Sequence, residues 1–115
     1  MTIREAINII DKLIPNVYDD EDKMKWLQDI ESLIYEEIIL THENPIEMTD
    51  FEDDNNELFA KSPYDNLYTS YLESKIHFNN KEIPRYNNAM AVFNEEYREY
   101  ANWYNRNNMP ITKEI

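Results

Sequence analysis

The sequence predicts an all-α fold: a single domain in which about four helices form a bundle. Its 115 residues are enough for one hydrophobic core of ordinary size and too few for two. It contains no glycine, and the tight turns of β-hairpins depend on residues that tolerate positive φ, so a β-rich fold is disfavoured. Apolar residues instead recur every three or four positions in separate stretches, the spacing of amphipathic helices. We therefore expect residues 1–115 to form one helical domain.

The first helix is expected to begin at Thr2. Residues 2–5 have the pattern of a capping box, in which the Thr2 hydroxyl and the Glu5 carboxylate bind free amides of the first turn. Pro15 ends the helix, since proline cannot continue the ladder of main-chain hydrogen bonds. The apolar stripe between these signals consists of Ile3, Ile7, Ile10 and Ile14.

The second helix is expected to begin at Asp19 or Asp20, either of which can cap it. Further acidic residues occupy its first turn, where the helix dipole favours negative charge. Trp26 lies off the apolar stripe, so this helix is expected to contact neighbours on more than one side. The stripe consists of Met24, Leu27, Ile30, Ile34 and Ile38.

A long acidic loop is expected at residues 44–62, between the second and third helices, because the apolar periodicity fails there. Calcium-binding loops need a glycine turn and an acidic residue at the twelfth position, and neither stands in the required register. We therefore predict a solvated loop, of a length that is often functional or mobile, rather than a metal site. The acidic residues of this loop that we single out are Asp50, Glu52, Asp53, Asp54 and Glu57.

The third helix is expected to open with Ser62 as its N-cap and Pro63 at its first helical position. Two asparagines, at positions 79 and 80, give it a plausible end. Its inward-facing residues are predicted to be Tyr64, Leu67, Tyr71, Leu72 and Ile76.

The fourth helix is expected to begin near Pro84 and to carry a long aromatic core face. Pro110 closes it, and residues 108–115 are predicted to form a flexible tail. The predicted core face consists of Ile83, Tyr86, Met90, Phe93, Tyr97, Tyr100, Ala101 and Tyr104.

The net charge of −13 resides in the first half of the chain. Residues 1–43 hold 11 acidic and 4 basic residues, and residues 44–62 hold 6 acidic residues and 1 basic residue. The remainder of the chain is nearly neutral. That remainder contains ten of the fifteen aromatic residues. Because proteins hold DNA phosphates with lysine and arginine, the acidic half should repel free duplex DNA, and we expect no sequence-specific nucleic-acid binding.

The residue types of common catalytic and metal sites are sparse. There is no cysteine, so a thiol nucleophile and a thiolate metal site are both excluded. His42 and His77 could share a metal if the ends of two helices meet, but a histidine near a helix C-terminus is also favourable with the helix dipole, which is the interpretation we prefer. No serine, histidine and acid stand in a motif for nucleophilic catalysis. We therefore expect no catalytic residue, no cofactor, no metal site and no enzymatic activity.

The chain lacks the segments that direct a protein into or across a membrane. No apolar run approaches the roughly 20 residues that span a bilayer. The first residues lack the apolar core of a signal peptide. We therefore expect a cytosolic location and no membrane contact.

The supply of aromatic residues exceeds what a single apolar stripe can bury. Spare aromatics at a surface are typical of interface anchors. Arginines on the fourth helix could pair with the acidic loop of a neighbouring subunit. The predicted anchors are Trp26, Tyr68, Trp103 and Tyr104, and the predicted pairing arginines are Arg85, Arg98 and Arg106.

Two regions of the sequence have a recognisable pattern. Residues 18–27 contain an aspartate-rich cap followed by Lys-x-x-Trp-Leu, and residues 63–73 and 85–94 contain regularly spaced tyrosines and an Arg-Tyr-Asn-Asn-Ala-Met run. These regions resemble small helical head-to-tail connector proteins of long-tailed bacteriophages and prophages. The resemblance implies a bundle of about four helices that assembles as a ring, commonly twelve-fold, between the portal and the next neck or tail component. It also implies that the protein is not an enzyme and that packaged DNA passes through the ring.

The expected function is therefore that of a structural protein of the phage neck. Its partners would be the portal protein, the next neck or tail protein and further copies of itself. It would occupy the host bacterial cytoplasm during assembly and the virion neck afterwards. We expect the acidic loop to face the channel or an axial neighbour, and the C-terminal tail to contact the portal or the adjacent subunit.

The rival hypothesis is an acidic inhibitor that mimics DNA and blocks a nuclease or restriction factor. The net charge of −13 suits this function. A mimic usually spreads its charge over one continuous face, however, and the C-terminal half of this chain is neutral and aromatic. The connector is therefore the preferred hypothesis.

Overall fold

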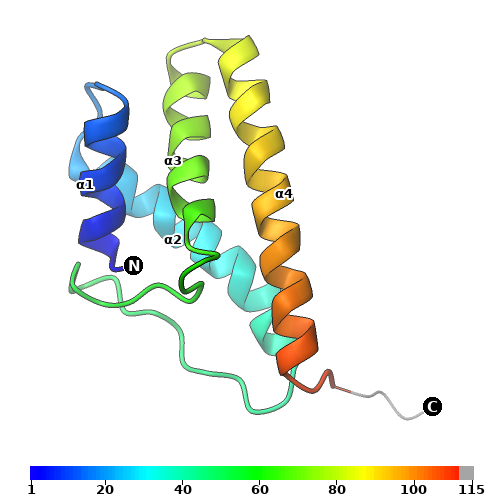
Figure 1. Ribbon diagram of the computed structural model, residues 1–115. Coiled ribbons are helices and arrows are strands. Elements are labelled where there is room, and N and C mark those ends of the chain that lie inside the picture. Colours follow the sequence, from blue (N-terminus) through cyan, green and yellow to red (C-terminus); the bar gives the residue numbers. More distant parts are fainter. Residues whose placement is uncertain (112–115) are drawn as a thin grey trace.

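Four α-helices make up the structure, a computed structural model that describes residues 1–111 (Figure 1). In Figure 1, α1, α3 and α4 stand side by side and α2 crosses behind them. The predicted all-α fold is confirmed, since the described residues form no strand beyond two isolated bridges. The helices are α1 (Ile3–Leu13), α2 (Asp20–Glu37), α3 (Asn66–Asn79) and α4 (Ile83–Asn107), with a short 3-10 helix, η1 (Ile39–Thr41), after α2.

The first two helices begin where the capping residues predicted. The Thr2 hydroxyl accepts a hydrogen bond from the Glu5 amide at 3.1 Å, and α1 follows directly. The Asp19 carboxylate accepts from the Asp22 amide at 3.0 Å and starts α2. In both cases a side-chain oxygen satisfies an amide that the first helical turn leaves without a partner.

The core lies around α3, which contacts each of the other three α-helices. The predicted stripes of α1 and α2 point inward, and most of their isoleucines and leucines are fully buried. Burying this much apolar surface supplies the main driving force for packing the helices. The fully buried aliphatic residues of the three helices include Ile3, Ile7, Ile10, Leu27, Ile34, Leu67, Leu72 and Ile76.

The long helix α4 packs along α3 through its aromatic face. Phe93, Tyr100 and Tyr104 are buried, as the spacing predicted. Ile83 is 49% exposed and does not belong to the core. It lies in the first turn of α4, next to the α3–α4 turn.

The third helix begins at Asn66 and not at Pro63, which corrects the prediction from the Ser62-Pro63 pair. The Ser62–Pro63 peptide bond is cis. Residues 61–64 form a turn in which the Tyr64 amide donates to the Lys61 carbonyl at 2.7 Å. This turn directs the chain out of the core, where residues 58–60 are buried, and only then can a helix begin.

The prediction of a long solvated acidic loop is not confirmed for residues 44–62. Leu58 and Ala60 are fully buried and Phe59 is 8% exposed, so part of this irregular segment belongs to the core. It is also fixed to the N-terminal residues, because the Leu58 amide donates to the Met1 carbonyl at 3.0 Å and the Arg4 amide donates to the Asp54 carbonyl at 2.8 Å. Because most residues of the segment are polar or acidic, the sequence did not indicate that Leu58, Phe59 and Ala60 would be buried and would fix it to the core.

The C-terminal end of the described chain pairs with the residues that follow α2. The Glu43 amide donates to the Met109 carbonyl at 2.8 Å, and the Ile111 amide donates to the Thr41 carbonyl at 2.9 Å. These bonds hold residues 109–111 beside residues 41–43. Of the predicted tail, residues 112–115 lie outside the described residues.

Candidate interaction surfaces

Tyr68 is not the surface anchor that the surplus of aromatics predicted. Its side chain is 0% exposed, which places it in the core. The Tyr68 hydroxyl donates to Glu31 Oε1 at 2.6 Å and accepts from the Ala60 amide at 2.9 Å. Tyr68 therefore joins α2 to the end of the 44–62 segment from within the core.

Glu31 is the polar centre of this core, and it is not among the residues that the sequence singled out. Its Oε2 accepts from the Thr49 hydroxyl at 2.7 Å and from the Phe59 amide at 2.9 Å, in addition to the bond from Tyr68 to Oε1. Burial raises the pKa of Glu31 above its ordinary value, and the three hydrogen bonds act in the opposite direction. A signal was present, because Glu31 lies four residues after Leu27 and three before Ile34, on the apolar face of α2.

The Glu31 network binds the irregular segment and offers no site for chemistry. Glu31 and Tyr68 are both sealed from solvent, and each of their polar atoms faces a protein partner. A buried carboxylate that accepts three hydrogen bonds is stabilised in place and has no room for a substrate. We therefore interpret the network as the anchor that holds residues 49–60 against α2 and α3.

Two acidic runs that are distant in sequence adjoin on one surface. The Arg4 guanidinium donates to Asp20 Oδ2 at 2.8 Å and to Asp54 Oδ2 at 2.6 Å. These two carboxylates raise the pKa of Arg4. The first turn of α2, residues 19–22, therefore lies beside residues 50–54, with the Arg4 guanidinium between a carboxylate of each run.

The five acidic residues predicted between positions 50 and 57 have different environments. Asp54 is held by Arg4, and Glu57 lies 3.1 Å from the N-terminal ammonium and 3.3 Å from Lys61 Nζ. These cations hold the pKa of Glu57 below its ordinary value. The remaining three carboxylates, those of Asp50, Glu52 and Asp53, are exposed.

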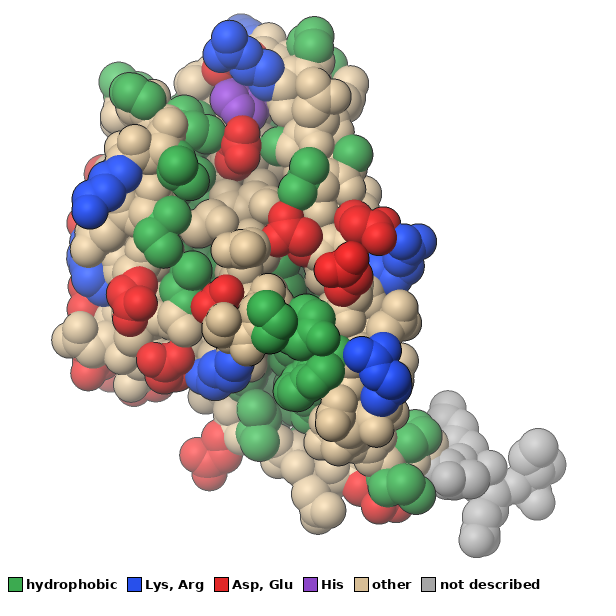
Figure 2. All heavy atoms as spheres, viewed as in Figure 1, with side chains coloured by type: hydrophobic (Ala, Val, Ile, Leu, Met, Phe, Trp, Pro, Cys, Tyr) green, Lys and Arg blue, Asp and Glu red, His purple; other side chains and the backbone are tan. Residues whose placement is uncertain are grey.

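The two tryptophans reach the surface, whereas Tyr104 does not. Trp26 is half-buried on α2, with its ring centroid 5.4 Å from that of Tyr18. Trp103 is half-buried on α4 and packs against Tyr64 with the ring centroids 5.5 Å apart. Figure 2 shows apolar side chains gathered beside the C-terminal half of α4. Tyr104 is 7% exposed and contacts the His42 ring, so its prediction as a surface anchor is wrong.

The three predicted arginines do not form one patch. Arg85 pairs with Glu82 at 2.9 Å, and Arg98 pairs with Glu95 at 2.5 Å, both as exposed ion pairs within one helical turn. Arg106 lies in the last turn of α4. Arg85 and Arg106 are separated by about 30 Å along the helix, at the usual rise per residue.

The two histidines lie at opposite ends of α4, so they share no metal. His42 is buried, with Nδ1 2.6 Å from the Ile38 carbonyl oxygen and Nε2 2.8 Å from Asn105 Oδ1. His77 lies in the last turn of α3, within 3.4 Å of carboxylate oxygens of Glu73 and Glu82. Among residues 1–111, no group of three or more histidine and acidic side chains could hold a metal ion.

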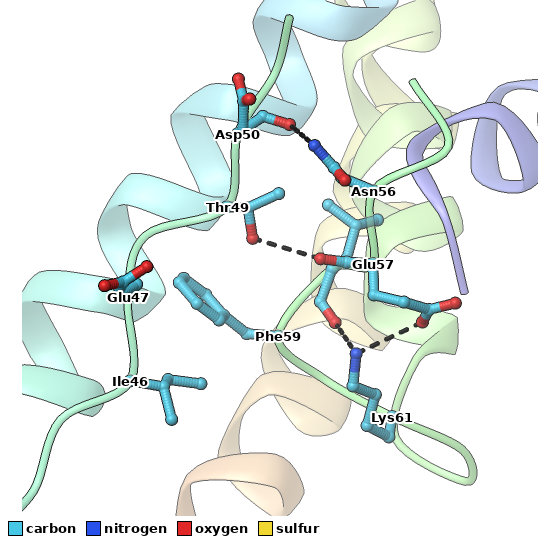
Figure 3. A pocket seen from close by; sticks show the side chains of 9 residues that line it. Ile46, Glu47, Thr49, Asp50, Asn56, Glu57, Phe59 and Lys61 are labelled. Carbon is cyan, nitrogen blue, oxygen red and sulfur yellow. Dashed lines mark hydrogen bonds and ion pairs between the residues drawn. The ribbon is translucent and has the colours of Figure 1, made fainter. Parts of the chain in front are cut away.

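A hollow of about 290 Å³ lies between residues 46–50 and residues 56–61; we call it the loop hollow. Figure 3 shows Phe59 and Ile46 facing each other across it, with Glu47 on one side and Lys61 on the other. The Lys61 ammonium donates to the Leu58 carbonyl at 2.7 Å. The hollow thus combines apolar side chains with carboxylates at its rim.

None of the described helices combines the length and the apolar character needed to cross a membrane. Comparisons with protein families, with curated proteins and with solved structures find no match for this chain.

Proposed function

We propose that the chain is a non-enzymatic subunit of the head-to-tail connector of a long-tailed bacteriophage or prophage. It occupies the host cytoplasm before assembly and the virion neck afterwards. Its partners are the portal protein, the next neck or tail protein and further copies of itself, which form a ring with the twelve-fold symmetry that is common among the connectors it resembles. The resemblance of residues 18–27 and 63–94 to such connectors supports the proposal.

The observation that carries the proposal is the division of charge between two parts of the fold. Residues 1–65 hold 18 acidic and 5 basic residues, which account for the entire net charge of −13. Helices α3 and α4, residues 66–107, hold 5 of each. A ring is built from head-to-tail contacts that join two different surfaces of the same chain, and a subunit with one anionic and one neutral side suits such contacts.

The two half-buried tryptophans add to this support because they belong to different parts of the fold. Trp26 belongs to α2 in the acidic part, and Trp103 belongs to α4 in the neutral part. Tryptophan is enriched among the residues that dominate binding energy at interfaces. An anionic surface toward a channel also lets DNA slide, because it offers few cations to hold phosphates.

The absolute mass of the purified protein, measured by light scattering alone and with the portal protein encoded nearest its gene, tests the proposal. We expect a closed ring or a stoichiometric complex with the portal. Trp103→Ala should weaken that assembly at least about tenfold, while Phe78→Ala, which removes another exposed aromatic ring, should not. A monomer that ignores the portal would overturn the proposal.

A second candidate, the acidic inhibitor that mimics DNA, is favoured by one observation. Arg4 brings residues 19–22 and 50–54 together, so the negative charge covers a more continuous surface than the sequence suggested. This function would be supported if the protein inhibited a basic nuclease and if that inhibition weakened steeply between 50 and 200 mM salt, about as steeply as binding of DNA does. The triple variant Asp20→Asn, Asp22→Asn, Asp53→Asn should then lose inhibition, and unchanged inhibition would exclude this function.

A further inference from the structure

The loop hollow has an apolar floor that is fixed before any partner arrives. Phe59 is stacked on Tyr35 of α2, with ring centroids 5.8 Å apart. The Phe59 amide is bound by Glu31 and the Ala60 amide by Tyr68, so the main chain beneath the floor is held in place. A preorganised apolar surface loses little freedom on binding. Ile46, at the rim, is 50% exposed and available to a partner.

The main chain beside the hollow is available for hydrogen bonding. Within the described part of the chain, the main-chain amides and carbonyls of residues 46–49 form no hydrogen bond. The neighbouring Asp50 carbonyl accepts from the Asn56 side chain at 2.8 Å, which ties the two sides of the hollow together (Figure 3). An exposed backbone edge next to an apolar depression is a surface that an extended peptide can join through its own main chain.

The charge around the hollow selects the partner. Residues 26–60 contain eleven acidic residues and no lysine or arginine. Glu47, Asp50 and Glu57 line the hollow, and Lys61, the one basic residue among the described residues that line it, is held by Glu57 and the Leu58 carbonyl. An anionic partner would be repelled here, whereas lysine or arginine side chains would be attracted.

We propose that the loop hollow binds an extended segment of a partner protein in which basic residues alternate with aliphatic ones. An aliphatic side chain of the segment packs on Phe59 and Ile46. Basic side chains pair with Glu47 and Asp50, and the segment's main chain bonds to residues 46–49. This inference does not depend on the connector proposal, and either can fail without the other.

Fluorescence anisotropy with labelled synthetic peptides tests the inference. The probe is Lys-Ile-Arg-Val-Lys-Ile, and the controls are Lys-Ser-Arg-Ser-Lys-Ser, which keeps the charge, and Glu-Ile-Glu-Val-Glu-Ile, which keeps the apolar residues. We expect the probe to bind, the serine peptide to bind at least about tenfold more weakly and the acidic peptide not to bind. Equal binding of the probe and the serine peptide would overturn the proposal, because charge alone would then explain the affinity.

Variants locate the binding. Ile46→Ser and Glu47→Lys should each weaken binding of the probe about fivefold or more. Val92→Ser on α4, where Val92 is 53% exposed, and Glu36→Lys on α2 are matched controls that should not change it. Circular dichroism establishes that all four variants fold. The proposal would be overturned if the two control variants weakened binding as much as Ile46→Ser and Glu47→Lys do. It would also be overturned if the probe did not bind and the protein instead associated with itself in a way that Ile46→Ser abolished. That second result would assign the hollow to another copy of the chain.

Discussion

Glu31 shows how a single buried side chain determines the path of a long irregular segment. Its two carboxylate oxygens accept from Tyr68, Thr49 and the Phe59 amide. Burying a charged carboxylate is costly, and three hydrogen bonds are what make the position tolerable. Removing a partner from such a network costs more than an ordinary hydrogen bond contributes, because the groups left behind are desolvated and unpaired.

We therefore expect Glu31→Gln to lower the free energy of unfolding by about 2–3 kcal/mol. The glutamine side chain has only one acceptor oxygen. Its NH₂ group must therefore face one of the donors that the carboxylate had bound, and that donor is left without an acceptor. Urea denaturation followed by circular dichroism measures the change. Glu36→Gln, an exposed position on the same helix, is the control and should change stability by less than about 0.5 kcal/mol. Equal stability of the two variants would contradict our account of the network.

The pH dependence of stability should distinguish Glu31 from Glu57. The pKa of Glu31 is raised in the folded state, so the folded protein holds this proton more tightly and loses stability as pH rises above the ordinary value of 4.5. The pKa of Glu57 is lowered, so its contribution is present above 4.5 and is lost as pH falls through the folded-state pKa.

Urea denaturation at several pH values tests these opposite signs. The stability difference between wild type and Glu31→Gln should shrink as pH rises from 4.5 upward. The difference between wild type and Glu57→Gln should instead grow as pH rises toward 4.5 from below and then level off, with a small amplitude because Glu57 is exposed. A Glu31 difference that grows with pH would show that its carboxylate is stabilised, not penalised, in the folded state.

At the scale of elements, helix boundaries set by local signals were predicted from the sequence, whereas boundaries set by long-range contacts were not. The starts of α1 and α2 were predicted correctly because a cap acts on amides two or three residues away. The start of α3 was not, because it depends on burial of residues 58–60 against distant helices. The same long-range packing explains why Tyr68, expected as a surface anchor, lies in the core. Nothing in the spacing of Tyr68 indicates that a carboxylate 37 positions away accepts its hydroxyl.

The cap of α2 gives a prediction at this scale. Asp19→Ala removes the acceptor of the Asp22 amide and should lower the free energy of unfolding by about 1 kcal/mol. Thermal denaturation followed by circular dichroism measures it. Glu21→Ala is the matched control, since it removes a charge from the same turn without removing the cap, and it should cost about 0.3 kcal/mol. Equal losses would mean that charge near the helix dipole, and not the cap, is what matters.

At the scale of the whole molecule, the negative charge opposes folding. The net charge of −13 is concentrated in residues 1–65, where the fold brings carboxylates of α2 and of the 44–62 segment close together around Arg4. Repulsion of this kind falls with salt, because ions screen exposed charges over about 10 Å at 0.1 M. Salt also screens the ion pairs of Arg4 and of Glu57, and weakening these favourable pairs lowers the stability of the fold.

Because the acidic residues far outnumber the basic ones, repulsion should be the larger effect. We expect the melting temperature to rise by about 3 °C between 20 and 200 mM NaCl. The variant Asp22→Asn, Glu52→Asn, Asp53→Asn, which removes three exposed charges and no ion pair of Arg4 or Glu57, should melt higher at low salt and respond less to NaCl. A melting temperature that falls with salt would mean that the few ion pairs around Arg4 contribute more to stability than the many like charges cost. In that case Arg4→Gln should abolish the response, since Arg4 is the residue that joins the two acidic runs.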